Sequence, residues 1–351
     1  MEGWMSRVLV TGGSGFLGSY CILRLLNAGH AVATTIRGSH REKDVRSMIR
    51  RGGASGDAKI DFFHANLESD AGWSDAVKDI DFVLHVASPF GGPQPKHEDD
   101  IVVPAREGTL RVLWAASKAD VKRVVLTSSF GAIGYGHKPR REPFTESDWT
   151  DITQSDVQPY IKSKTVAERA AWDFVEHDDS EMELTVVNPV GIFGPVLGPN
   201  FSSSVHIMRA MLAGEMPFAP RIYFGLVDVR DVADLHLRAM TSPKAAGERF
   251  LAVAGEPLSM LEVARILRRE LGERALRAPS RQIPDALVHV LSLLSPRMRQ
   301  LVPQVGKRRR ASNSKARSLL DWSPRPNEEI IAATGHSLLA LQDEAGSAKL
   351  G

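Results

Sequence analysis

The sequence predicts an α/β protein with a doubly wound parallel Rossmann sheet and a smaller, mostly helical C-terminal substrate lobe. Two observations predict this class. Short runs of β-branched residues alternate with longer amphipathic stretches over the first half of the chain, and the runs are apolar almost throughout. Strands of a parallel sheet have this composition because helices cover both faces of the sheet.

The expected strands open each repeating unit of this pattern. They are Arg7–Gly12, Ala31–Arg37, Ile60–Ala65, Asp81–Ala87, Arg123–Ser129 and Leu184–Asn188. The clearest helices between them are Phe16–Ala28, Asp100–Ala119 and Tyr160–His177. Because crossovers between parallel strands are right-handed, a ligand is expected beyond the carboxyl ends of the strands.

The alternation ends after Pro189, where a segment rich in Gly, Pro and Ser begins. Returning strands are expected at Tyr223–Val229 and Arg249–Val253. Further helices are expected at Ser203–Ala213, Asp231–Met240, Ser259–Glu270, Pro284–Leu294 and Glu328–Leu341. The predicted division is a Rossmann domain of residues 1–190, to which 223–253 returns, and a lobe of residues 191–222 and 254–345.

Composition narrows the class of partner. The 351 residues carry a formal net charge of +2, with 43% hydrophobic and 25% charged residues, so neither nucleic acid nor a membrane is an expected partner. The most basic run, Lys307–Arg310, is expected to be a solvated loop. The single cysteine, Cys21, excludes an intrachain disulfide, and no metal site is predicted. With no leader pattern or long apolar window, a cytoplasmic location is expected.

A glycine-rich turn follows the first strand and opens the first helix. Gly12, Gly13, Gly15 and Gly18 leave backbone N–H groups at a helix N-terminus unobstructed, as a phosphate requires. In this strand–turn–helix context the pattern predicts dinucleotide binding.

The end of the second strand indicates which dinucleotide is bound. An enzyme using NAD places an acidic residue there to bind the ribose hydroxyls, but no acid occurs between Phe16 and Arg41. Arg37 stands at that position instead, and its guanidinium suits a 2′-phosphate. The sequence therefore predicts NADPH as the cofactor.

Three further residues predict acid–base chemistry. Tyr160 and Lys164 are four residues apart at the start of a helix, so they share one face, and the ammonium is expected to lower the pKa of the phenol. Ser129 lies at the carboxyl end of the fifth strand, where it can bind a substrate oxygen beside the tyrosine. His85, in an apolar strand, is expected to be a buried core histidine.

In combination, these motifs resemble the extended short-chain dehydrogenase/reductase family, and within it the dihydroflavonol reductases and microbial aldehyde/ketone (carbonyl) reductases. The likeness covers almost the whole chain. It rests on Thr11–Gly18, Arg37, His85–Pro89, Thr127–Ser129, Tyr160 with Lys164, Asn188–Pro195, Val227–Ala233, Asn313–Ala316 and Leu319–Trp322.

The resemblance implies a Ser129, Tyr160 and Lys164 catalytic set that transfers hydride from NADPH to a ketone or aldehyde. It also implies an NADP-binding role for the Rossmann domain and a substrate-binding role for the lobe. The implied cofactor-binding residues are Gly12, Gly15, Phe16, Leu17, Gly18, Arg37, Asn66, Leu67, Val86, Ala87, Ser88, Tyr160, Lys164, Pro189, Val190 and Ile192. Asp44 replaces a basic residue common in the plant enzymes, so Arg41 or Lys43 is expected to assist Arg37.

The expected partner is a small, mainly apolar carbonyl compound, and the protein is expected to be a monomer or homodimer. The residues expected to line the substrate pocket are Phe90, Phe130, Phe193, Tyr223 and Leu226. Gly134 replaces an Asn that holds catechol hydroxyls in plant dihydroflavonol reductases. A sugar-nucleotide epimerase or dehydratase and a hydroxysteroid-type dehydrogenase stay open as alternatives. A non-catalytic NADPH sensor is disfavoured because Ser129, Tyr160 and Lys164 are all present.

Overall fold

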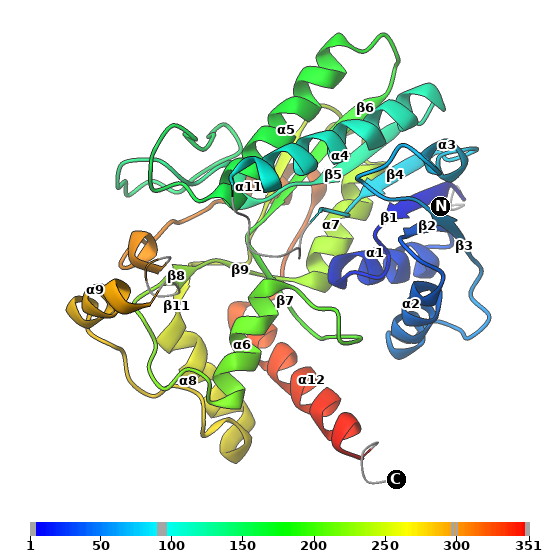
Figure 1. Cartoon of the computed structure of the whole chain (residues 1–351). Coiled ribbons are helices and arrows are strands. Elements are labelled where there is room, and N and C mark those ends of the chain that lie inside the picture. Colours follow the sequence, from blue (N-terminus) through cyan, green and yellow to red (C-terminus); the bar gives the residue numbers. More distant parts are fainter. Residues whose placement is uncertain (1–4, 90–96, 296–298, 300, 348–351) are drawn as a thin grey trace.

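The computed structural model describes residues 5–89, 97–295, 299 and 301–347. Its centre is a seven-stranded parallel sheet in the order β10-β6-β5-β4-β1-β2-β3 (Figure 1). The strands are β1 (Arg7–Thr11), β2 (Ala31–Ile36), β3 (Ile60–His64), β4 (Phe82–His85), β5 (Arg123–Thr127), β6 (Glu183–Pro189) and β10 (Arg249–Ala252). The sheet confirms the predicted fold class, with each expected strand of the first half in place.

Helices cover both faces of this sheet. One face carries α1 (Phe16–Asn27), α2 (His40–Arg51) and α7 (Val229–Thr241); the other carries α3 (Trp73–Ala76), α4 (Asp99–Lys118) and α5 (Pro159–His177) (Figure 1). Alternate side chains of β1 point into the two cores: Val8 and Val10 lie in one and Leu9 in the other. Burial on both faces explains why the strand sequences are apolar throughout.

The rest of the chain adds short strands and helices beside the sheet (Figure 1). The strands are β7 (Gly191–Phe193), β8 (Tyr223–Phe224), β9 (Leu226–Asp228) and β11 (Leu258–Ser259). The helices are α6 (Ser203–Ala213), α8 (Met260–Leu271), α9 (Asp285–Leu294), α11 (Ser314–Leu320) and α12 (Asn327–Ser347), with 3₁₀ turns η1 (Phe130–Ala132), η2 (Pro243–Ala245), η3 (Gly272–Ala275) and η4 (Val302–Gln304).

The structure corrects the prediction that Tyr223–Val229 returns to the main sheet. The segment breaks at Gly225 into β8 and β9, which pair with β11 and β7, and only β10 joins the main sheet. At the break the carbonyl of Gly225 accepts a hydrogen bond from the N–H of Gly191, next to the β7–β9 pairing. A Cβ at Gly225 would also lie only 3.0 Å from a methyl carbon of Val190.

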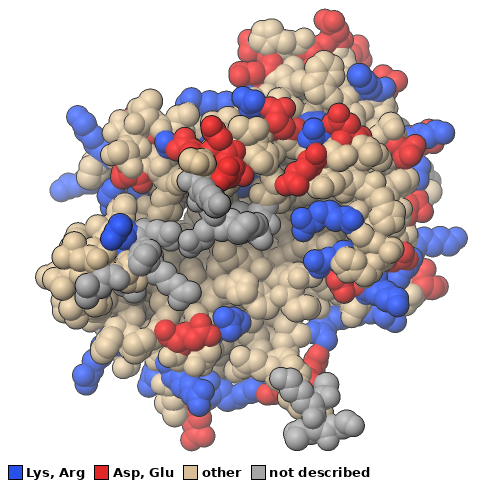
Figure 2. Space-filling view, in the orientation of Figure 1, with Lys and Arg blue, Asp and Glu red and all other residues tan. Residues whose placement is uncertain are grey.

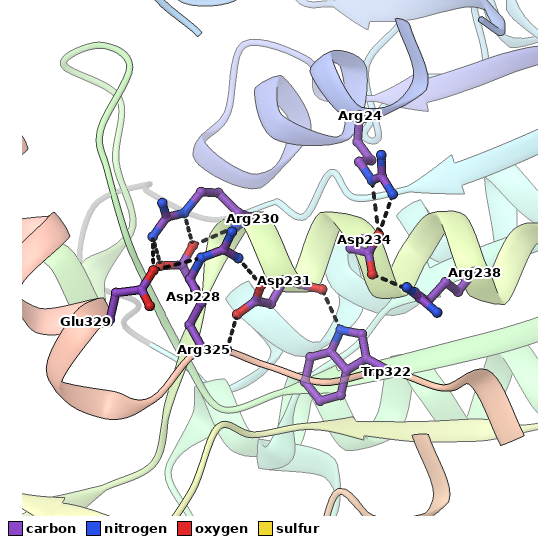
Figure 3. A network of polar contacts seen from close by, with 9 residues as sticks. All are labelled: Arg24, Asp228, Arg230, Asp231, Asp234, Arg238, Trp322, Arg325 and Glu329. Atoms are coloured by element: carbon purple, nitrogen blue, oxygen red, sulfur yellow. Dashed lines mark hydrogen bonds and ion pairs between the residues drawn. The ribbon is translucent and has the colours of Figure 1, made fainter. Parts of the chain in front are cut away.

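A network of charged residues ties the C-terminal segment to α7 (Figure 3). The main-chain N–H and the guanidinium of Arg325 both bind the carboxylate of Asp231. The main-chain carbonyl of Asp231 accepts a 2.9 Å hydrogen bond from Trp322 Nε1. One turn further along α7, Asp234 binds Arg24 of α1 and Arg238. Sequence-distant parts of the chain therefore meet on one helix.

The strand order reverses between β1 and β4, so the loops after these strands diverge and leave a crevice at the carboxyl edge of the sheet. Within the described ranges, no helix has both the length and the apolar composition needed to cross a bilayer.

Candidate active site

The turn between β1 and α1 is packed so closely that only glycine fits at two of its positions. Gly12 has a φ of +71°, and a Cβ there would lie 3.0 Å from the Cβ of Ala87. A Cβ on Gly18 would lie 2.4 Å from the carbonyl oxygen of Gly12. The turn therefore brings the main chain close to the N-terminus of α1, where N–H groups can bind an anion.

Hydroxyl groups from neighbouring strands hold this turn in place. The N–H groups of Gly12 and Gly13 donate to Thr35 and Thr34, each at 3.1 Å. Thr11 Oγ1 accepts the N–H groups of Val86 and Ala87, both at 3.0 Å, and lies 2.9 Å from His85 Nδ1. Because the oxygen already accepts two hydrogen bonds, its own proton is directed to His85.

His85 is the buried core histidine that its apolar strand predicted. It is 1% exposed, and burial, with a smaller effect from the charge of Lys164, lowers its pKa to about 3. The ring is therefore neutral near pH 7 and fixes the loop that follows β4.

A cleft of about 360 Å³ runs along this edge of the sheet. The residues that the sequence analysis assigned to cofactor binding all line it, and so does Ser129. The cleft is also lined by residues that the sequence analysis did not assign to cofactor binding: Ser14, Thr35, Ile36, Ala65, Glu68, Trp73, Pro89, Thr127, Ser128 and Ser202–Ser204. The structure thus brings the predicted residues together, while their role in binding a cofactor stays a prediction.

Two arginine side chains lie near the connection between β2 and α2. Arg37 and Arg41 both line the cleft, whereas Lys43 lies outside its lining. Arg41 also makes a 3.4 Å ion pair with Asp44, the residue that replaces the plant enzymes' basic side chain. Figure 2 shows Lys and Arg side chains gathered beside the hollow on the side of α1 and α2. This position suits an anionic group such as a 2′-phosphate.

Ser129, Tyr160 and Lys164 meet at the opposite part of the cleft. Ser129 lies two residues after the end of β5, and its Oγ accepts the N–H of Gly131 at 2.9 Å. The phenol of Tyr160 lies close enough to the Ser129 hydroxyl for that group to lower its pKa. Pro159 at the first turn of α5 fixes where the helix begins, so Tyr160 and Lys164 fall on its cleft side.

The electrostatics of this group differ from the expectation that Lys164 lowers the pKa of Tyr160. Burial raises the pKa of the phenol, the nearby phenol of Tyr135 adds to the rise, and only the hydroxyl of Ser129 opposes it. The ammonium of Lys164 lies 6.0 Å from the Tyr160 ring and donates instead to Ser88 Oγ at 3.1 Å. Burial lowers the pKa of Lys164 to about 8, an effect that the charge of Glu168 partly offsets.

Most of the side chains predicted to line the substrate pocket belong to the core, which corrects that prediction. Phe193 and Leu226 are 0% exposed, and Phe193 stacks on Phe224 with 5.8 Å between ring centroids. Phe130 is buried in a cluster with Ile133, Phe144 and Leu251. Apolar residues at strand ends were assigned to the pocket because sequence cannot show which side they face.

The two other residues predicted to line the substrate pocket are Tyr223 and Phe90. Tyr223 keeps an exposed edge, and the guanidinium of Arg308 lies 5.8 Å from the centroid of its ring. Phe90 lies outside the described residues.

The basic run Lys307–Arg310 is an exposed loop, as expected, except that Arg309 is partly buried near this site. Lys307 makes a 2.6 Å ion pair with Asp156, just before α5, and Arg310 pairs with Glu256. The guanidinium of Arg309 lies 4.2 Å from the centroid of the Tyr135 ring, and this ring is the neighbour that raises the pKa of Tyr160. No local pattern could have found this packing, because its partners lie far away in the sequence.

Residues 8–253 match the model of the NAD dependent epimerase/dehydratase family. The chain belongs to this family. Among its curated members, the chain is 35% identical over 284 residues to cinnamoyl-CoA reductase CAD2 of Medicago truncatula, covering 79% of this chain and 82% of that protein. It is 38% identical over 249 residues to tetraketide alpha-pyrone reductase 2 of Arabidopsis thaliana, covering 69% and 76%.

A solved structure of a reductase has the same fold. The yeast methylglyoxal/isovaleraldehyde reductase Gre2, complexed with NADPH, superposes with a TM-score of 0.79 at 25% identity, covering 96% of this chain and 99% of that one. These relatives confirm the expected family and its reductase branch. Their names give different substrates, so the comparisons do not assign one to this family member.

Proposed function

We propose that this oxidoreductase transfers hydride from NADPH to the carbonyl carbon of a ketone or aldehyde and gives an alcohol. The observation that carries the proposal is that Ser129, Tyr160 and Lys164 share one cleft with Arg37 and the glycine-rich turn. A carbonyl oxygen and a phosphorylated dinucleotide would then be bound by the two parts of a single site.

The residues present fit NADPH. The turn at Gly12 and Gly18 admits no side chain, as close approach of a pyrophosphate requires, and Arg37 with Arg41 supplies positive charge for the 2′-phosphate. We propose that the Rossmann domain of residues 1–190, with 223–253, binds this cofactor and that the lobe of residues 191–222 and 254–345 contributes to substrate binding. When bound, NADPH supplies the hydride.

The protein residues supply the proton and hold the substrate oxygen. Ser129 and Tyr160 hydrogen-bond the carbonyl oxygen, and Tyr160 donates its proton to the developing alkoxide. Lys164, on the same side of α5, orients the nicotinamide ribose. Since the pKa of Tyr160 is raised, the phenol is protonated near pH 7, as an acid in the reducing direction must be.

We propose further that the substrate is mainly apolar. Gly134 provides no side chain to hold ring hydroxyls, and a Cβ there would lie 2.2 Å from Cζ of Phe130. A polyhydroxylated ring would lose hydrogen bonds to water on entering, at about 1–3 kcal/mol for each unpaired group.

The test is an initial-rate assay of the purified protein with NADPH and NADH against aryl ketones, aldehydes, α-ketoesters and diketones. Dihydroflavonols, hydroxysteroids and sugar nucleotides are included as competing classes. We expect NADPH consumption with apolar carbonyl compounds and a higher kcat/KM for NADPH than for NADH. Turnover of sugar nucleotides without net cofactor consumption would instead identify an epimerase or dehydratase.

A further inference from the structure

A fully buried carboxylate lies behind the predicted catalytic residues. Glu168, on α5, is 0% exposed, and Arg249 of β10 donates to its Oε1 at 2.6 Å. Its Oε2 accepts two more hydrogen bonds, from Ser128 Oγ at 2.5 Å and from Asn188 Nδ2 at 2.7 Å. Three neighbouring strands, β5, β6 and β10, are thus tied to one helix by a single side chain.

Stability alone is a poor explanation for such a group. Removing two charges from water costs several kcal/mol for each ion, and a buried ion pair replaced by apolar residues of similar volume often leaves a protein no less stable. The polar group around Glu168 is also incompletely satisfied, because Nη2 of Arg249 and Oδ1 of the neighbouring Asn188 are buried without a hydrogen-bond partner among the described residues. The specific geometry of the pair therefore calls for a functional explanation.

The bonds of Glu168 converge on the backbone that presents Ser129. Ser128 is the residue immediately before it, and Asn188 Nδ2 also lies 3.3 Å from the carbonyl oxygen of Ser129 as a hydrogen-bond donor. Glu168 therefore holds both sides of this short segment, one directly and one through Asn188.

Glu168 is also connected to Tyr160, through the helix α5 that carries both residues. Tyr160, Lys164 and Glu168 follow one another at intervals of four residues on α5, so they lie on one face of the helix. The helix that carries the phenol is thereby bound to the strand end that carries the serine hydroxyl.

We propose that Glu168 is a positioning residue that, together with Asn188, holds the Ser129 hydroxyl beside the phenol of Tyr160. The inference rests on the proposed reductase function for its kinetic consequence, but the contact itself can be measured separately. Misplacing a group by about 1 Å can reduce the rate of a reaction by up to about a hundredfold.

The chain offers a matched control at the opposite end of the same strands. Arg123 begins β5 and Glu183 begins β6, and they form a 2.5 Å ion pair in which the Arg123 side chain is 6% exposed. This pair also joins β5 to β6, but it lies at the amino edge of the sheet, away from the cleft. Glu183→Gln should lower stability without moving Ser129.

The kinetic experiment compares Asn188→Leu and Glu168→Gln with Glu183→Gln in the full chain. Asn188 is 0% exposed and does not line the cleft, so its replacement acts only through other residues. We expect kcat to fall by about tenfold to a hundredfold in the first two variants, while the Kd for NADPH stays within about threefold. Glu183→Gln should keep kcat within about twofold.

Titration of the Tyr160 phenol gives a readout that needs no turnover. The ultraviolet titration of each protein is compared with that of the same protein carrying Tyr160→Phe, and the difference isolates this phenol. Since the Ser129 hydroxyl lowers the pKa of this phenol, displacement of Ser129 in Asn188→Leu should raise that pKa further.

The inference is overturned if the phenol titrates unchanged in Asn188→Leu and Glu168→Gln, or if kcat in these variants falls no more than in Glu183→Gln. If the native protein reduces no carbonyl compound, the proposed function fails, and the titration still decides whether Glu168 positions Ser129.

Discussion

Replacing Lys164 with methionine should make the protein more stable near pH 7 while it abolishes carbonyl reduction. The ammonium is partly buried, and its pKa falls from 10.5 to about 8 because burial penalises the charged form. Such a fall corresponds to about 3 kcal/mol of unfavourable free energy in the folded state, and methionine has no charge to bury.

The pH dependence gives the sign of this effect. Between about pH 8 and 10.5 the unfolded chain still binds the proton that the folded chain has lost, so the native protein gains stability as the pH rises through this window. Below about pH 8 Lys164 is charged in both states, so the full free-energy cost of burying its ammonium applies. The advantage of Lys164→Met should therefore be about 3 kcal/mol near pH 7 and should shrink toward zero by about pH 10.5.

The assay is urea denaturation of the native protein and Lys164→Met without nucleotide, near pH 7 and near pH 10. Lys162→Met serves as a control because Lys162 makes an ion pair with the exposed carboxylate of Glu98, which should contribute no more than about 1 kcal/mol. The reasoning is refuted if Lys164→Met is no more stable than the native protein near pH 7, or if its advantage is equal at both pH values.

Three more variants test other parts of the site. Tyr160→Phe should lower kcat by about a hundredfold or more while NADPH still binds, because it removes the proton that the alkoxide needs; near-native turnover would contradict this role. Arg37→Ala should weaken NADPH by about tenfold to a hundredfold and leave NADH little changed, as measured by the Kd of each nucleotide. Gly18→Ala should prevent nucleotide binding, because its Cβ would meet the carbonyl oxygen of Gly12 at 2.4 Å, whereas Gly56→Ala, with open space around it, should bind normally.

The sequence predicted best those features that depend on short segments. The glycine spacing, Arg37 at a strand end and the interval from Tyr160 to Lys164 each reflect local geometry, and the structure brings all of them to one cleft. Arg37 could be placed because strand alternation alone located the carboxyl end of β2.

The features that sequence reasoning missed depend on contacts between distant segments. Phe193 and Leu226 look like pocket residues by position, yet their own strands, β7 and β9, pair with each other and turn both side chains into the core. The pKa of Tyr160 is raised by burial and by Tyr135, while Lys164 donates to Ser88, and a helical interval reveals none of this. The packing of Arg309 on Tyr135 is likewise a matter of tertiary structure.

The charged network on α7 makes the stability of the Rossmann sheet depend on the C-terminal segment of the chain. The family model ends at residue 253, but Trp322 is 1% exposed and its indole binds Asp231, which also holds Arg325. A chain truncated after residue 253 would leave that aspartate without its cation and expose the apolar surface that Trp322 covers. Proteolysis or denaturation should therefore release no stable amino-terminal fragment, and the sheet and C-terminal helices should unfold in one cooperative transition.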